Sequence, residues 1–196
     1  MLRKFCVLMA ALLLSTALLR AQVKEAATAG GLSLEVGGQV STFNPDWGCV
    51  SASPFSCWNH QLFGLGVVVD ANHLVYKFGA EGEARWLHWR GPGQQLVQTN
   101  YLIGPRYPVL RHGKTSLYAK ALFGGSWSTF DQGLVTGSYF TIAPGATVEY
   151  HLTRRLIARG DYEYQMWPAF SGVPTLPNNG LTPNGFSAGV SYQLLR

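Results

Sequence analysis

Eight segments of the chain, from about Leu32 onward, alternate apolar and polar residues with a period of two. Each segment has one bulky stripe that is nearly free of charge and one stripe of Gly, Ser, Thr and Gln with a few ions. Because successive side chains of a β-strand point to opposite faces, each segment predicts a strand with one apolar face. The segments are 32–42, 61–70, 78–86, 97–109, 116–127, 140–150, 158–166 and 186–194.

The connections between these segments predict how the strands are joined. Longer polar or Gly/Pro-rich links follow the odd strands, and shorter links follow the even strands. This alternation is typical of an up-and-down barrel with long loops at one end and short turns at the other. The expected long links are 44–59, 90–94, 131–137 and 171–184, and the expected short links are 71–75, 111–114 and 153–155.

The first 21 residues predict an export signal. Arg3 and Lys4 precede an apolar run over 5–19, and Ala21 provides a small residue for cleavage before Gln22. A later cleavage after Ala29 and an uncleaved anchor are the alternatives. The expected organisation is a signal peptide over 1–21, a short N-terminal segment over 22–31 and a barrel over 32–196. After the signal no run of 18 or more apolar residues occurs, which excludes a helical membrane protein.

Composition narrows the class only partly. Charged residues make up 13% of the chain and hydrophobic residues 47%, with 23 glycines, which fits either a barrel in lipid or a secreted β-sandwich. The net charge of +5 is not concentrated in any Lys/Arg cluster, so we expect no nucleic-acid partner. In an exported chain Cys49 and Cys57 predict a disulfide within one loop, and only His60 lies close enough in sequence to suggest a metal site instead.

A soluble barrel and a membrane barrel differ in which face of the wall is polar. The sparse ions among Gly and Ser suit a narrow filled lumen, and aromatic residues gather near both strand ends, where membrane barrels carry girdles. We therefore predict an all-β protein: a single antiparallel up-and-down transmembrane β-barrel of about eight strands, monomeric, with outer-membrane lipid as its partner. The expected girdles are Phe43, Trp86, Trp89, Trp127, Phe130, Tyr139 and Trp167 at one end, and Tyr76, Phe78, Tyr107, Tyr150 and Tyr192 at the other.

The chain resembles the OmpA/OmpX-like outer-membrane β-barrel family over residues 30–196. The resemblance is carried by Gly-Leu-Gly-Val at 64–67, Gly-Glu-Ala-Arg-Trp at 82–86 and Gly-Val-Ser-Tyr-Gln-Leu at 189–194. It implies a bacterial outer-membrane location. The terminal motif looks like the family's assembly signal, which the barrel-insertion machinery reads. The family usually ends on an aromatic residue, whereas this chain ends on Arg196.

The charged residues on the polar stripes are the candidate site. Since an unpaired ion is costly in a narrow lumen, we expect them to pair across strands. Such a network either plugs the barrel or acts as a gate when partners exchange, a role that the resemblance also suggests. The predicted members are Glu35, Glu81, Glu83, Arg85, Arg106, Lys120, Glu149, Arg159, Asp161 and Glu163.

Two other functions remain open from the sequence. The loops over 44–59 and 171–184 suit a surface binder or adhesin, because loops on a rigid scaffold commonly carry binding. An outer-membrane lipid A-modifying enzyme needs a Ser-His pair at the outer rim, for which His88 with Ser126 or Ser128 is the available combination. We expect no catalytic residues, cofactor or metal.

Overall fold

The computed structural model describes residues 31–45, 61–91, 94–130, 135–168 and 180–195. The predicted signal peptide, nearly all of the N-terminal segment and the predicted Cys49–Cys57 disulfide lie outside these ranges. No helix in the described part of the chain is long and apolar enough to cross a membrane. The strands are β1 (Ser33–Asn44), β2 (Leu62–Val75), β3 (Phe78–Gly91), β4 (Gln94–His112), β5 (Thr115–Phe130), β6 (Val135–His151), β7 (Leu156–Tyr164) and β8 (Asn184–Leu195).

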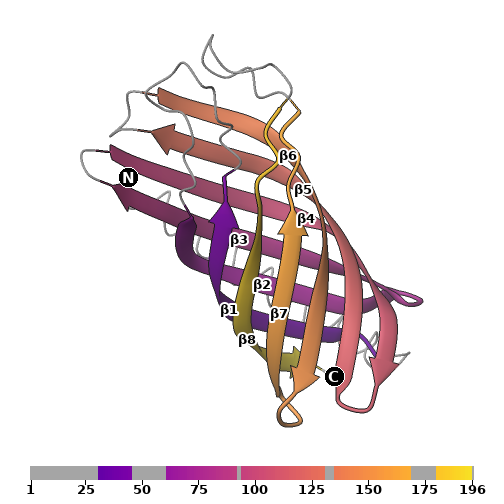
Figure 1. Cartoon of the computed structure of the whole chain (residues 1–196). Coiled ribbons are helices and arrows are strands. Elements are labelled where there is room, and N and C mark those ends of the chain that lie inside the picture. The colour runs from indigo at the N-terminus through magenta and orange to yellow at the C-terminus, as the bar shows by residue number, and fades with distance from the viewer. Residues whose placement is uncertain (1–30, 46–60, 92–93, 131–134, 169–179, 196) are drawn as a thin grey trace, which may run out of the picture.

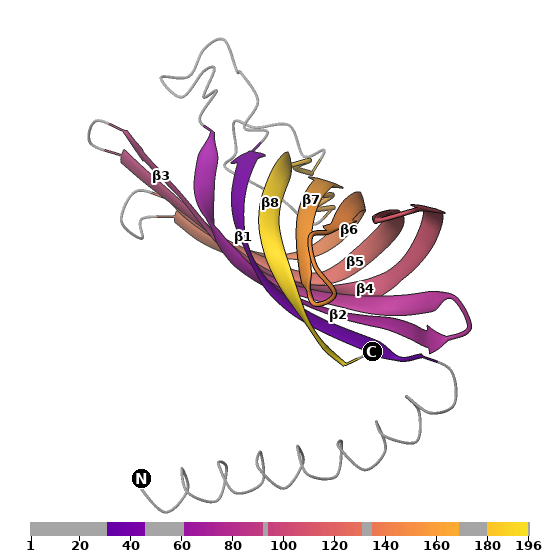
Figure 2. The ribbon, with the colours of Figure 1, turned by 90° about the horizontal axis from the view of Figure 1, so that it is seen from below.

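The eight strands form a closed barrel in which each strand pairs with the next in sequence (Figure 1). All pairs are antiparallel, and β1 closes the barrel against β8, so that Val36 lies opposite Val69 on one side and Tyr192 on the other. Leu34 at the start of β1 pairs with Leu195 at the end of β8. Figure 2 shows these two strands side by side in the curved wall. The predicted up-and-down topology is confirmed.

The outer face of the wall is apolar over most of each strand. Large side chains there are widely exposed, as Leu65 (64%), Ile103 (66%) and Phe186 (62%) illustrate. Such a surface is unfavourable in water and favourable against acyl chains, which is why the alternating pattern places its bulky stripe outward. The expected girdle at the turn end also faces outward, with exposures from 37% to 84% across Tyr76, Phe78, Tyr107, Tyr150 and Tyr192.

Two of the four links predicted to be long are in fact short. β3 and β4 remain paired up to Gly91 and Gln94, and β5 and β6 up to Phe130 and Val135. Backbone hydrogen bonds between strands need no apolar side chains. The strands therefore continue through polar residues that the alternating pattern had assigned to loops. The connections over 45–61 and 165–183 remain long, while 76–77, 113–114 and 152–155 are short.

Four aromatic residues expected in the outer girdle face the lumen instead. Phe43 and Trp167 are almost fully buried, Trp89 packs against the cluster that contains Phe43, and Tyr139 stacks on Trp167 at 5.4 Å between ring centroids. Phe43 lies two residues from the inward Ser41, and Trp89 lies four residues from the inward Arg85. Residues an even number of positions apart on a strand (of the same parity) point to the same face. Their position along the chain suggested a girdle, but their parity decided their direction.

Candidate functional site: the charged lumen

The lumen contains seven carboxylates and four cations, each at most 5% exposed. The structure places all ten predicted residues there and adds Asp70, which the candidate set lacked. Asp70 alternates with the apolar residues of β2, so its position in the sequence already placed it on the polar face. The eleven residues are Glu35, Asp70, Glu81, Glu83, Arg85, Arg106, Lys120, Glu149, Arg159, Asp161 and Glu163.

Lys120 on β5 lies among carboxylates from β3 and β7, and three of them are within 3.1 Å. Its Nζ is 2.6 Å from Glu81 Oε1, 2.5 Å from Glu83 Oε1 and 3.1 Å from Asp161 Oδ1. The oxygens of these three acids lie within 4.8 Å of one another, a spacing that also suits a metal ion. The ammonium group of Lys120 already supplies the positive charge at their centre.

Arg159 on β7 joins this centre to the opposite wall. Its Nη1 is 2.7 Å from Asp70 Oδ2, and its Nη2 is 2.8 Å from Asp161 Oδ1 and 3.2 Å from Glu81 Oε1. Two of these acids also contact Lys120. Ionised partners make short and strong hydrogen bonds, so the shared acids connect β2, β3, β5 and β7 into one network.

Arg106 on β4 extends the network toward the end with short turns. Its Nη1 is 2.6 Å from Asp70 Oδ1, and its Nη2 is 2.5 Å from Glu149 Oε1. The guanidinium carbon lies 3.9 Å from the ring centroid of Tyr118. A planar guanidinium can bond carboxylates at its edge while its face packs on an aromatic ring, which a lysine cannot do.

Arg85 on β3 forms the boundary between the ion pairs and an apolar layer. Its Nη1 is 3.0 Å from Glu163 Oε1, and its Nη2 pairs with Glu83. The guanidinium lies 4.5 Å from the ring centroid of Phe43. Phe43 in turn packs with other fully or nearly fully buried apolar side chains at the loop end of the lumen, namely Leu62, Leu87 and Leu96.

An amide and hydroxyl layer lies beside this apolar cluster. Asn100 Nδ2 donates to Ser126 Oγ at 2.7 Å and to Gln165 Oε1 at 3.1 Å. Trp167 Nε1 donates to the same Gln165 oxygen at 3.1 Å. The lumen is therefore filled by ion pairs toward the turn end and by neutral side chains toward the loop end.

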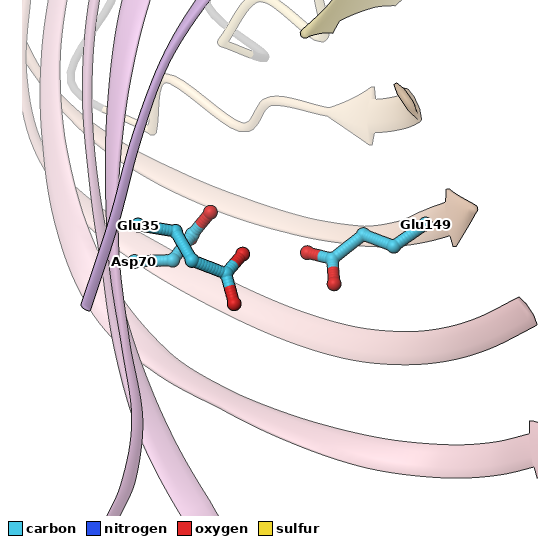
Figure 3. A group of neighbouring side chains, drawn as sticks. All are labelled: Glu35, Asp70 and Glu149. Atoms are coloured by element: carbon cyan, nitrogen blue, oxygen red, sulfur yellow. The ribbon is translucent and has the colours of Figure 1, made fainter. Parts of the chain in front are cut away.

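The lumen has more acids than cations, and the excess gathers near the turn end. Glu35, Asp70 and Glu149 lie together in Figure 3, with carboxylate oxygens within 4.8 Å of one another. Arg106 contacts the last two. Glu35 Oε1 accepts hydrogen bonds from Ser33 and Asn72, and among the described residues it forms no ion pair. The formal excess of three negative charges disfavours anions in the lumen.

The Ser-His combination considered from the sequence does not form. His88 faces outward and is exposed, whereas Ser126 and Ser128 face the lumen and are 0% and 8% exposed. The wall of the barrel separates the imidazole from both hydroxyls. These residues therefore do not provide the nucleophile and base that acyl-transfer chemistry requires.

Comparison with known proteins agrees with this geometry. Residues 9–193 match the outer membrane protein beta-barrel domain, and the chain belongs to that family. It is a bacterial outer-membrane β-barrel. None of the curated proteins compared with the chain matches it in sequence.

Several solved structures share the fold at low sequence identity. Neisserial surface protein A (NspA) matches with a TM-score of 0.57 and 13% identity, covering 83% of this chain and 97% of that one. OprG of Pseudomonas aeruginosa matches with 0.52 and 12%, covering 84% and 97%. Ail, the attachment invasion locus protein of Yersinia pestis, matches with 0.50 and 15%, covering 83% and 97%. The likeness extends over nearly the whole of each relative.

Proposed function

We propose that this protein is a structural outer-membrane barrel whose lumen is closed at rest, and that it admits at most small ions when ion-pair partners exchange. The observation that carries the proposal is the position of Arg85. It pairs with Glu83 and Glu163 on its polar side and lies over the Phe43 ring on the other. One side chain thus links the ion network to the apolar layer.

The physical case against an open pore is the depth of burial. An eight-stranded barrel has an interior just wide enough for side chains to fill. Here each of the four cations contacts at least one acid at 3.0 Å or less, so water in the lumen must compete with charge-assisted bonds. Brief exchange of partners, such as Glu83 leaving Lys120 while it keeps Arg85, is compatible with passage of a small cation but not of a sugar or nucleotide.

Planar-bilayer conductance of the refolded protein tests this proposal. The wild type is expected to show no steady open level, whereas Arg85→Ala is expected to show frequent openings with cation selectivity. Arg90→Ala is the matched control, because Arg90 is an exposed arginine on the same strand and outside the network. A large steady conductance in the wild type, or an Arg85→Ala trace identical to it, contradicts the closed-lumen function.

A second function is binding at the cell surface. It is supported by the composition of the strand ends that lie beyond Trp86 on β3 and Trp127 on β5. There the outward side chains become polar, including His88 and Thr136. Strands that continue past the apolar zone present a rigid surface outside the membrane. One structure of the similar protein Ail holds the heparin analogue sucrose octasulfate, which makes heparin a reasonable probe.

Binding of fluorescent heparin to intact cells tests this second function, because only the outer end of the barrel is then accessible. The paired substitution His88→Ala with Arg90→Ala is expected to lower binding several-fold. Arg154→Ala, at the turn end, serves as the control and is expected to leave it unchanged. If the wild type, the His88/Arg90 double variant and Arg154→Ala bind heparin equally, these strand ends are not the binding surface.

A further inference from the structure

The charges of the described residues are sorted by location. Every described acid is buried in the lumen, together with four of the cations. The other six described cations are exposed, and five of them lie at the end with the short turns, where β8 finishes (marked C in Figure 1). We call these five the basic rim: Lys77, Arg111, Lys114, Arg154 and Arg155.

The basic rim has no acidic partner among the described residues. Arg111 Nη2 lies 3.2 Å from His73 Nε2, and Arg155 Nη1 donates to Tyr192 Oη at 3.0 Å. Neither contact neutralises a charge. Like charges gathered on three neighbouring turns repel one another, so their arrangement favours a negatively charged partner outside the chain.

Two of the turns enclose a depression that suits such a partner. Its volume is about 380 Å³, and its lining is Lys114, His151, Leu152, Thr153, Arg154 and Gln193. The backbone N–H of His151, the last residue of β6, donates to the Lys114 carbonyl at 2.9 Å, which holds the β4–β5 turn against the end of β6. The carbonyl of Lys114 is therefore already hydrogen-bonded within the barrel. Lys114 and Arg154 both line the depression, and both residues are exposed.

Exposed apolar side chains lie among these cations. They favour a lipid surface over a soluble anion as the partner. Val75 is 73% exposed, Tyr76 84%, Leu110 60% and Leu152 47%. A surface that mixes cations with apolar and tyrosine side chains is typical of the zone between acyl chains and headgroups. A soluble polyanion or the cell-wall polymer satisfies the charges but leaves these apolar groups in water.

We propose that the basic rim binds the phosphates of anionic phospholipids in the periplasmic leaflet, with Lys114 and Arg154 holding one headgroup between the β4–β5 and β6–β7 turns. The short turns of bacterial outer-membrane barrels face the periplasm, which places the rim at that leaflet. A cation near an anionic membrane surface contributes about a five-fold preference. The proposal does not depend on whether the lumen conducts.

Spin-labelled lipids measure this preference directly. The refolded full chain is placed in phosphatidylcholine bilayers, and the association of spin-labelled phosphatidylglycerol is compared with that of spin-labelled phosphatidylcholine by electron paramagnetic resonance. The wild type is expected to prefer phosphatidylglycerol several-fold. The double variant Lys114→Gln/Arg154→Gln is expected to lose most of that preference, and Arg90→Gln at the other end is expected to keep it.

Each outcome separates the partners. Because both substituted side chains are exposed, the variants are expected to retain the heat-modifiable gel shift of a folded barrel, which is checked first. If 1 M salt brings the association of phosphatidylglycerol close to that of phosphatidylcholine, headgroup charge is the cause of the preference. At that salt concentration charges are screened beyond about 3 Å. The inference fails if the double variant retains the wild-type preference. It also fails if the rim variant loses binding to isolated cell-wall polymer while its lipid preference is unchanged.

Discussion

Replacing Lys120 by Met tests the energetic role of the lumen network most directly. The substitution keeps an unbranched side chain of similar volume and removes the ammonium group that lies 2.5–3.1 Å from Glu81, Glu83 and Asp161. Three acids then lie close together with one fewer cation. Arg159 still reaches Glu81 and Asp161, while Glu83 keeps only its contact with Arg85.

The expected loss of stability follows from burial. Lys120 is 4% exposed, and removing one partner of a buried ion pair costs about 3–5 kcal/mol, because the remaining charge stays desolvated. Lys77→Met is the matched control, since Lys77 is an exposed lysine in the β2–β3 turn and exposed substitutions change stability by about 0.5 kcal/mol or less. Most of the loss should return when Glu81 and Glu83 are also neutralised by Glu→Gln.

The assay is urea unfolding of the protein refolded in lipid, followed by the heat-modifiable gel shift and by tryptophan fluorescence. We expect the urea midpoint of Lys120→Met to fall far below that of Lys77→Met. The triple variant, which adds Glu81→Gln and Glu83→Gln to Lys120→Met, is expected to regain most of the lost midpoint. The reasoning is refuted if Lys120→Met and Lys77→Met unfold at the same urea concentration. A triple variant less stable than Lys120→Met also contradicts it, because the acids then stabilise the barrel by something other than charge pairing.

Two further predictions concern the wall. A Cβ at Gly124 would lie 2.0 Å from the Tyr101 carbonyl oxygen, so Gly124→Ala should cost about 1–3 kcal/mol, whereas Gly160→Ala, with no atom within 4 Å, should be neutral in the same urea assay. Ile103 and Leu110 are similarly exposed on β4 at 66% and 60%, but only the first lies in mid-strand. Ile103→Arg should therefore cost about 2–4 kcal/mol and Leu110→Arg about 0–1 kcal/mol, and equal costs would contradict this depth assignment.

The sequence alone determined the direction of most side chains. A strand alternates its faces strictly, so the parity of Glu81, Glu83 and Arg85 places all three on one face without knowledge of any partner. The alternation within β2 likewise places Asp70 on the polar face of that strand. Strand lengths were less predictable, because β4 and β5 continue through polar residues whose backbones pair regardless of side chain.

Only the tertiary structure decided which charges meet. Lys120 and Glu81 are 39 positions apart, and Arg159 and Asp70 are 89 apart. These contacts run across the lumen and depend on closure of the barrel and on the stagger of its strands, which no local pattern encodes. Closure also separated the buried acids from the exposed cations of the turns. Parity is a property of each strand, whereas partnership is a property of the closed barrel.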